Sequence, residues 1–236
     1  LQAMPHRFDL HVHSWYSGDA TDPPGELIAA ARARGLSGIA ITDHNSCGAH
    51  RYCRESGLSR ADGLPVDGFL VIPAVEVSTA EGHLLCYGVS LPRLVGAPCA
   101  EVFEMVESLG GVAIPAHPYD QWRAGIREQT LDSLPLKSLE IFNAAVTSRS
   151  YNEKARAYAA RRGLVPIAGS DAHRASAVGT AVTAFDLPEL SVPAVVEALR
   201  SGKPSLEENY LSRSEGIKKH LGNWFRFGNR RPPPES

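Results

Sequence analysis

Residues 8–45 read FDLHVHSWYSGDATDPPGELIAAARARGLSGIAITDHN, and this stretch decides the predicted fold class. Its first apolar run, residues 8–12, predicts a short strand that carries His11 and His13 at its end. Side chains two residues apart in a strand point to the same face, so the two imidazoles form a ready pair of metal ligands. Asp19 follows in a loop that contains glycine, and it adds a carboxylate at the same end of the strand.

The second half of this stretch predicts a helix and another strand. Pro23-Pro24 is typical of a helix start, and the Ala-rich run that follows ends at Gly35. The apolar residues 38–42 predict the second strand, which ends in Asp43-His44. Together these elements predict a βαβ unit with chemically competent side chains at the carboxyl ends of its strands.

The same alternation continues along the chain. Further strands are expected at 70–78, 83–88, 112–115, 139–143, 166–169 and 180–185, and further helices at 50–56, 98–109, a segment ending at 134, 152–162 and 192–201. Pro73 inside the first of these strands predicts a bulge or a sheet edge. Polar side chains follow nearly every predicted strand, whereas an open doubly wound sheet would gather its ligands at one switch point. The pattern therefore favours a closed α/β barrel with a site at its carboxyl face.

Composition narrows the class of protein further. The chain has 236 residues, 43% of them hydrophobic, and a formal net charge of -2. This charge does not predict a broad basic surface for a stable nucleic-acid complex. No apolar run approaches the ~20 residues of a membrane span, and the first residues lack the apolar core of a signal peptide. The four cysteines contain no CxxC pair, which favours reduced thiols and a cytoplasmic location.

Nine side chains of metal-ligand type fall at predicted strand ends. They are His11, His13, Asp19, His44, Glu76, His83, His117, Asp171 and His173. A catalytic zinc needs only three protein ligands, so this set suits two or three divalent ions. Mixed imidazole and carboxylate ligands favour Mn, Zn or Fe, with Mg as a further candidate. Glu76 is placed to bridge two ions, and adjacent ions can activate a water and bind a phosphoryl group.

Several nearby polar residues have a simpler interpretation. A single histidine is more often structural than a ligand, so His6, His50 and His220 are interpreted as surface residues. Asp43 could cap the turn that follows it or support a ligand from behind, with even odds. Glu140 is expected to be a polar residue of the barrel interior that at most contacts a metal ligand and does not bind a metal itself.

The order of these motifs resembles the PHP family (polymerase and histidinol phosphatase). The motifs are, in chain order, His11-Val12-His13, Thr42-Asp43-His44, Glu76, Ala116-His117-Pro118 and Gly169-Ser170-Asp171-Ala172-His173. The resemblance implies a distorted (β/α)7 barrel with a trinuclear metal centre. By position in these motifs, His11, His13, Glu76 and Asp171 would hold one ion, Glu76, His83 and His117 a second, and Asp19, His44 and His173 a third. Some members of the family have histidine where Asp19 stands, which bears on the metal at the third site.

The resemblance also implies an activity, the hydrolysis of a small phosphorylated metabolite by a hydroxide that bridges two ions. A nucleotide-like substrate such as a 3',5'-bisphosphonucleotide ranks above histidinol phosphate. Glu76, His44 and Asp43 are the candidate catalytic residues, the last two as proton relays to the leaving oxygen. Arg149 and Arg174 follow strand ends and could bind a substrate phosphate.

Other interpretations stay open at this point. Arg149 and Arg174 could equally be solvated surface arginines, and so could Arg123. The alternative functions are a histidinol-phosphate-type phosphatase, an amidohydrolase-like metal hydrolase and a non-catalytic PHP module. The barrel is expected over residues 1–204 and a C-terminal extension over residues 205–236, disordered from residue 230. The expected partner is a small phosphorylated substrate, with no membrane and no stable nucleic-acid complex, and the sequence leaves the oligomeric state open.

Overall fold

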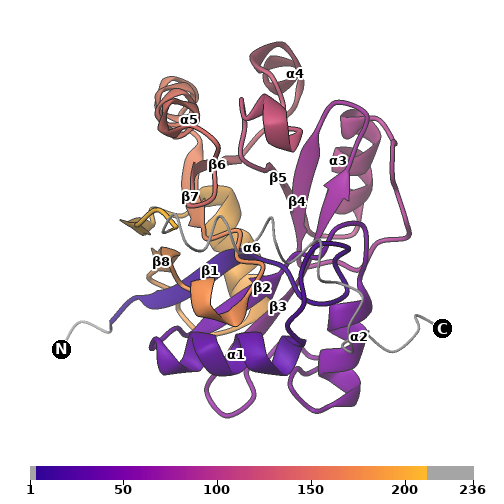
Figure 1. Cartoon of the computed structure of the whole chain (residues 1–236), viewed down its shortest axis with the longest axis vertical. Coiled ribbons are helices and arrows are strands. Elements are labelled where there is room, and N and C mark those ends of the chain that lie inside the picture. The colour runs from indigo at the N-terminus through magenta and orange to yellow at the C-terminus, as the bar shows by residue number, and fades with distance from the viewer. Residues whose placement is uncertain (1–3, 212–236) are drawn as a thin grey trace.

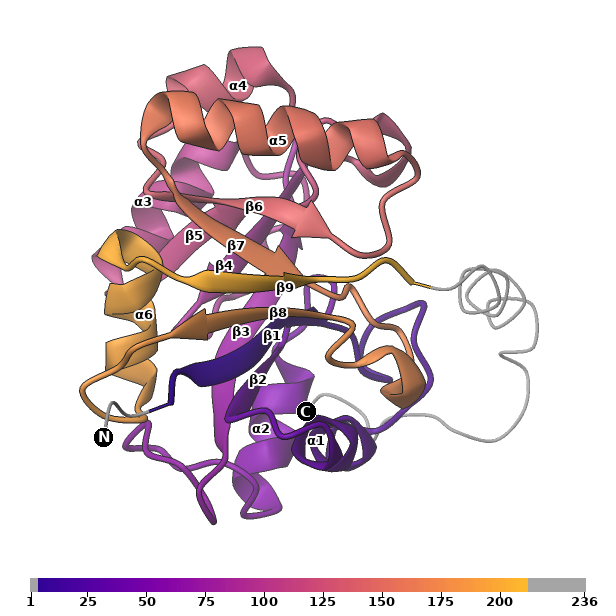
Figure 2. The same ribbon diagram turned by 90° about the vertical axis from the view of Figure 1, so that its left-hand side faces the viewer.

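The computed structural model describes residues 4–211, and their strands curl into a ring with helices along most of its outside, while β8 and β9 carry none (Figures 1 and 2). The strands are β1 (His6–Val12), β2 (Gly38–Ile41), β3 (Leu70–Ser78), β4 (His83–Tyr87), β5 (Val112–Pro115), β6 (Ser138–Asn143), β7 (Val165–Gly169), β8 (Ala181–Phe185) and β9 (Ser205–Glu208). The α-helices are α1 (Pro24–Ala33), α2 (Gly48–Glu55), α3 (Cys99–Ser108), α4 (Glu128–Ser133), α5 (Arg149–Arg162) and α6 (Val192–Ser201). Two short 3-10 helices are η1 (Gln121–Arg123) and η2 (Ala175–Ala177).

The strands form a seven-stranded sheet and a separate two-stranded sheet. The larger sheet has the order β5-β4-β3-β2-β1-β8-β9, and β6 pairs with β7 in the smaller one. The βαβ unit is confirmed, because β1 and β2 pair in parallel across α1. A backbone hydrogen bond of 2.8 Å from Asp171 N–H to His11 O joins the end of β7 to β1 and extends the ring. The fold is therefore a distorted α/β barrel of the predicted class.

Not all strands run in the same direction. β4 is antiparallel to β3, and β8 is antiparallel to β1. β3 and β4 form a hairpin, with Ser78 opposite His83. The start of β4 therefore lies at the same end of the barrel as the end of β3.

Alternation along the strands separates an inner core from an outer one. In β3, Leu70, Ile72 and Ala74 face the inner core, and Glu76 continues that face toward the mouth. Helix α6 closes the opposite end of the barrel, as Figure 2 shows, and packs Val195 and its neighbours onto the inner core. The inner space is therefore filled with side chains below the mouth, and only the mouth remains for a site.

The other helices cover the outside of the ring. Helix α1 buries Leu27 and Ile28 against Ile39 of β2, while α3 and α5 cover the outer face from β3 to β6. Helix α1 begins directly after Pro23, with proline at its first position, as predicted. Its end at Arg34 is followed by Gly35 at a φ of 68°, a conformation that costs glycine little.

One local prediction is wrong. Pro73 marks neither a bulge nor a sheet edge, because β3 lies inside the sheet between β2 and β4. Its carbonyl accepts a hydrogen bond from Gly88 N–H at 2.7 Å, and Gly88 lies just past the end of β4. The missing N–H of the proline therefore leaves no residue of β4 without a hydrogen-bond donor.

The sheet continues past residue 204, because β9 pairs with β8 at its edge. The division between barrel and extension stays a prediction, and the expected disorder from residue 230 lies outside the described residues. Within residues 4–211, no helix combines the length and the apolar character that a membrane span requires.

Candidate metal centre

The structure brings all nine predicted ligand side chains to one end of the barrel. They come from β1, β3 and β4 and from the loops that follow β1, β2, β5 and β7: His11, His13, Asp19, His44, Glu76, His83, His117, Asp171 and His173. Most of them are buried or nearly so. They fall into four overlapping groups, in each of which the ligand atoms lie within 4.8 Å of one another.

A register shift in β1 helps to place His11 and His13. Phe8 and Leu10 face the inner core, and the pairing with β2 shifts between Asp9 and Val12. His11 and His13 then both reach the mouth, with ring centroids 5.2 Å apart. Bulges of this kind redirect side chains and are common beside functional sites.

The carboxylate of Glu76 lies at the centre of the site, and five imidazole nitrogens surround it. Its Oε1 is 2.8 Å from His83 Nδ1 and 3.1 Å from His117 Nε2. Its Oε2 is 3.3 Å from His11 Nε2, 3.2 Å from His13 Nε2 and 3.2 Å from His44 Nδ1. A carboxylate with imidazole nitrogens beside both of its oxygens has the arrangement that a bridge between two ions requires.

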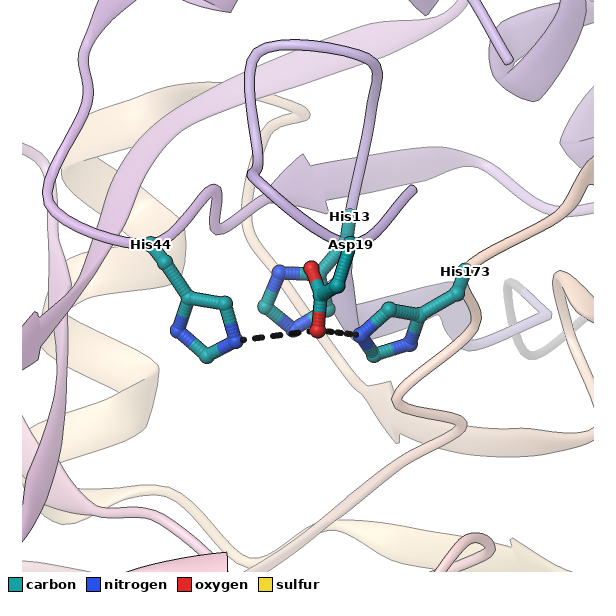
Figure 3. Close-up of side chains that lie close together, drawn as sticks. All are labelled: His13, Asp19, His44 and His173. Atoms are coloured by element: carbon teal, nitrogen blue, oxygen red, sulfur yellow. Dashed lines mark hydrogen bonds and ion pairs between the residues drawn. The ribbon is translucent and has the colours of Figure 1, made fainter. Parts of the chain in front are cut away.

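A second centre of contacts forms around Asp19, as Figure 3 shows. Asp19 Oδ2 lies 2.8 Å from His173 Nε2 and 3.6 Å from His44 Nε2. The His13 ring lies between these histidines, with centroids 4.3 Å from His173 and 4.5 Å from His44. His13 therefore belongs to this group as well as to the one with His11 and Asp171, and it also contacts Glu76, which its motif alone did not indicate.

These residues fit divalent cations. Two atoms that are each bound ~2.1 Å from one ion lie roughly 3–3.4 Å apart at common coordination angles, close to most of the distances above. His13 Nε2, His44 Nδ1 and Asp19 Oδ1 are buried without a hydrogen-bond partner among the described residues. Buried polar atoms normally have partners, so atoms left open toward a shared centre indicate a site for a ligand. The group around Asp19 and the three groups that involve His11 or Glu76 could each hold an ion.

Charge at the site also favours cations. Burial alone would lower the pKa of His13, but its proximity to the carboxylates of Asp171 and Glu76 outweighs this effect and raises the pKa to about 9. Burial would raise the pKa of Glu76, but the imidazoles of His44, His83 and His11 hold it well below its ordinary value. The carboxylates therefore stay ionised and create a field that attracts positive charge.

Glu140 supports two of the ligands from behind. Its fully buried carboxylate accepts a hydrogen bond from His11 Nδ1 at 2.9 Å and one from His117 backbone N–H at 2.6 Å. The first bond fixes the His11 tautomer so that Nε2 faces Glu76. Asn143 Nδ2 donates to Glu140 at 3.2 Å and to Asp171 at 3.0 Å, and so connects two parts of the site.

Asp43 also lies behind the ligands. It is fully buried and accepts hydrogen bonds of 2.6 Å from both Ser14 N–H and Ser14 Oγ. Burial raises its pKa to about 6, although the bonds from Ser14 oppose the shift. These bonds anchor the loop after His13, so the structure places Asp43 as a support rather than as a cap of the following turn.

The backbone is unusual at three places near the site. The φ values are 31° at His117, 54° at Asp171 and 55° at Asn45, and residues other than glycine rarely adopt this backbone conformation. Such conformations persist where the surroundings impose them, and they are concentrated at functional sites.

Arg123 is a site residue whose role the sequence did not reveal. Its guanidinium forms an ion pair with the carboxylate of Asp171 and donates to Asn143 Oδ1 at 3.3 Å and to Ala145 O at 3.2 Å. Burial would lower its pKa, but the charges of Asp171 and Glu76 raise it. The interpretation as a solvated surface arginine is therefore wrong.

The two arginines predicted to bind substrate are placed differently. Arg149 begins α5 and is exposed, and its guanidinium stacks on the Tyr210 ring at 4.3 Å. Arg174 directly follows His173 and is partly buried, with no side-chain hydrogen bond or ion pair recorded within residues 4–211. Contact with Tyr210 occupies one face of Arg149, whereas Arg174 is held beside the site by its neighbour in sequence.

The surface interpretation of the other histidines is only partly right. His50 is buried at 7% exposure on α2, so this prediction is wrong, because α2 packs that side against β3. His6 is half-buried at the start of β1, and His220 lies outside the described residues.

Comparison with known proteins agrees with this geometry. Residues 9–92 match the family model of the PHP domain, and residues 149–204 match a model described as PHP-associated. The chain belongs to the PHP family. An uncharacterised protein of Methanocaldococcus jannaschii is 28% identical to this PHP protein over 146 residues, which are 58% of this chain and 81% of that one.

Solved structures share the fold at low sequence identity. PsfC from Pseudomonas syringae superposes with a TM-score of 0.71 at 19% identity, over 95% of this chain and 98% of that one. A two-domain protein from Bacteroides vulgatus, described as containing a predicted PHP-like metal-dependent phosphoesterase, gives 0.69 at 18%, over 93% and 70%. A lesion-specific endonuclease from Pyrococcus furiosus gives 0.64 at 18%, over 85% of this chain and 58% of that one. The PHP protein thus has the fold of metal-dependent phosphoesterases.

Proposed function

We propose that this PHP protein is a phosphomonoesterase that hydrolyses a small, nucleotide-like phosphorylated metabolite with two or three bound divalent ions. The observation that carries the proposal is Glu76, whose carboxylate contacts five imidazoles at the barrel mouth. When bound, the ions would supply Lewis acidity toward the phosphoryl oxygens and a water of lowered pKa. Manganese, zinc and iron suit this ligand set, and magnesium suits it less well because few of the ligands are oxygens.

The ligand assignment that we propose follows the contacts of Glu76 and Asp171 with the histidines. His11, His13 and Asp171 with Glu76 would hold one ion, and Glu76 with His83 and His117 a second. Asp19, His44 and His173, with His13 close by, would hold a third.

Two residues of this chain are placed to act on the phosphate ester. The cationic guanidinium of Arg123 lies against Asp171 and can neutralise charge that develops on a phosphoryl oxygen. The His44 imidazole keeps 25% of its surface exposed and lies at the mouth, where it can pass a proton to the leaving oxygen. Asp43 takes no part in this transfer, since its two oxygens are committed to Ser14.

The nucleotide-like substrate is supported by Trp122. This side chain is 77% exposed and directly precedes Arg123 in η1, so it lies on the same loop as a residue of the site. A tryptophan left exposed beside a phosphate-binding arginine offers a surface on which a nucleobase can stack. Arg174, beside the metal ligand His173, is the better of the two predicted arginines for a further phosphate contact.

A phosphate-release assay tests the proposal. We expect the protein reconstituted with manganese to release phosphate from 3',5'-bisphosphonucleotides faster than from histidinol phosphate, and a separate assay of amine release should find no hydrolysis of an amide substrate. Glu76→Gln serves as the matched control, since it keeps the size of the side chain but removes the central charge. Preferred hydrolysis of histidinol phosphate or of an amide would favour those alternative functions, and cleavage of lesion-containing DNA alone would replace the small substrate with a nucleic acid. No turnover of any of these substrates would identify a non-catalytic module.

A further inference from the structure

A cavity of about 470 Å³ lies beside the candidate metal centre, between α2 and the loop after β4. Its lining includes Asn45, His50, Arg51, Arg54 and Arg93. We call it the α2 cavity. None of the nine candidate metal ligands lines it, so it is distinct from the metal centre.

His50 presents an unused hydrogen-bond donor at the α2 cavity. Its Nε2 lies 2.8 Å from Ala74 N–H, which can only donate, and 3.4 Å from Ile41 O, so the much shorter contact makes Nε2 the acceptor. The ring proton of the neutral imidazole then sits on Nδ1, on the side of the ring away from β3. Nδ1 is buried and has no hydrogen-bond partner within residues 4–211. A buried N–H of this kind is costly unless a ligand accepts its proton.

The arginines make the α2 cavity positive. Arg51, Arg54 and Arg93 line it, against one acidic residue, Glu55. Arg54 and Arg93 have no recorded side-chain hydrogen bond or ion pair in the described part of the chain. Arg54 acts on His50 directly, because its charge adds to burial in lowering the pKa of His50 to about 4.

The start of α2 adds to this field. Gly48 begins the helix and lines the cavity, and the first turn contains no acidic residue. The amino end of a helix carries partial positive charge and suits anions. Guanidinium groups, a helix start and a buried imidazole N–H together make a donor set for phosphate oxygens.

Asn45 connects the α2 cavity to the metal centre. It directly follows His44 and lines the cavity, and its Nδ2 donates to Ser78 Oγ at 2.9 Å. Ser78 Oγ in turn lies 3.4 Å from His83 Nε2. The cavity therefore adjoins two of the candidate metal ligands.

We propose that the α2 cavity binds a phosphate group, through Arg54, Arg93 and the Nδ1–H of His50. The group could belong to the substrate, as a second phosphate beside the one at the metal centre, or to free inorganic phosphate. Only the first of these sources rests on the proposed function. Both use the same recognition chemistry, and the experiment below distinguishes them.

Calorimetric titration of the manganese-loaded full chain with inorganic phosphate tests binding. We expect two sites, one of which is lost or weakened roughly ten- to a hundredfold in Arg54→Ala/Arg93→Ala. The control is Arg156→Ala/Arg161→Ala, which removes two exposed, ion-paired arginines on α5 and the same net charge. In Glu76→Gln, which disrupts the metal centre, the site in the α2 cavity should remain. Circular dichroism melting confirms that each variant is folded.

The source of the phosphate follows from kinetics. A fall in kcat/KM for adenosine 3',5'-bisphosphate, with adenosine 3'-monophosphate unaffected, assigns the cavity to the substrate. Unchanged kinetics with weakened phosphate binding assigns it to free phosphate. Phosphate binding that Glu76→Gln abolishes, or that Arg54→Ala/Arg93→Ala leaves unchanged, overturns the proposal. If the protein shows no turnover but its α2 cavity still binds phosphate, the proposed function is contradicted and the phosphate site is not.

Discussion

Glu140→Gln is the substitution for which the structure gives the clearest expected magnitude. The carboxylate accepts from His11 Nδ1 on one oxygen, and from His117 N–H and Asn143 Nδ2 on the other. Glutamine keeps the shape but has a single oxygen acceptor, so its NH₂ must face one of these donors. At least one hydrogen bond to a charged, buried acceptor is lost.

The expected cost follows from that count. A hydrogen bond to a charged group contributes about 1.5–3 kcal/mol, and loss of a residue that orients a metal ligand weakens metal binding by roughly 10–100-fold. The two figures agree, because a tenfold change in affinity corresponds to about 1.4 kcal/mol. We expect the weakening at the ions that His11 and His117 would hold, since Glu140 contacts both residues.

Competition with a chromophoric chelator measures this effect. Metal affinity is compared between the wild type, Glu140→Gln and the control Glu128→Gln, which removes an exposed carboxylate paired with Arg161. The reasoning is refuted if Glu140→Gln binds metal within twofold of the wild type while remaining folded. Equal weakening in the control would instead point to a general effect of net charge.

Four further predictions concern the site and the fold. Elemental analysis of the purified protein should find two to three divalent ions per chain, and Glu76→Gln should lower this number and reduce turnover by several orders of magnitude; full loading of the variant would contradict its central role. Arg123→Ala should reduce kcat/KM about 10–100-fold, with little rescue by lysine, which cannot form the same fork. Arg174→Ala should lower kcat/KM for a bisphosphorylated substrate more than for an aryl phosphate, and Arg149→Ala should show a smaller difference between the two substrates. Equal losses of kcat/KM on both substrates would exclude a phosphate-binding role. Because burial lowers the pKa of His50 to about 4, below its unfolded value of 6.5, stability should fall as pH decreases between these values. Urea unfolding measures the free energy of unfolding at pH 7 and at pH 4.5. The decrease between these two values should be about 2–3 kcal/mol larger in the wild type than in His50→Gln, and an equal decrease in both proteins would show that His50 does not titrate as described.

The clustering of the candidate ligands could be predicted because strand ends leave a strong local signal. His11 and His13 fall two residues apart at the end of an apolar run, and that spacing fixes their common face. Glu76 and His83 lie on either side of the short turn between β3 and β4, and such a turn brings the residues that flank it together.

Arg123 could not be predicted in this way, since its direction depends on a loop. Asp120 accepts a hydrogen bond from Trp122 N–H and others from Thr147, and Ala124 takes a left-handed conformation at a φ of 53°. These contacts join segments that are distant in the sequence, and they turn Arg123 toward Asp171.

The burial of His50 can be predicted from the periodicity of its helix. His50 lies three residues before Cys53, and both are on the buried side of α2. The helix is only eight residues long and its mean composition is polar, so its inner face is defined by few positions. The pairing of His50 with Ala74 then depends on tertiary packing that the sequence does not display.

The position of Asp171 and His173 late in the chain has a consequence for synthesis. As the chain leaves the ribosome, all candidate ligands up to His83 emerge before Asp171 and His173, and His44, Glu76 and His83 among them already form one of the possible ion groups. The groups that need Asp171 or His173 cannot form until β7 has folded against β1, where Asp171 N–H bonds to His11 O. Domains acquire structure as their residues become available, so ions would load in a fixed temporal order. A chain that stalls before β7 would hold a partial ligand set, and the metal it captures would be selected by imidazoles and the carboxylates of Asp19 and Glu76 alone.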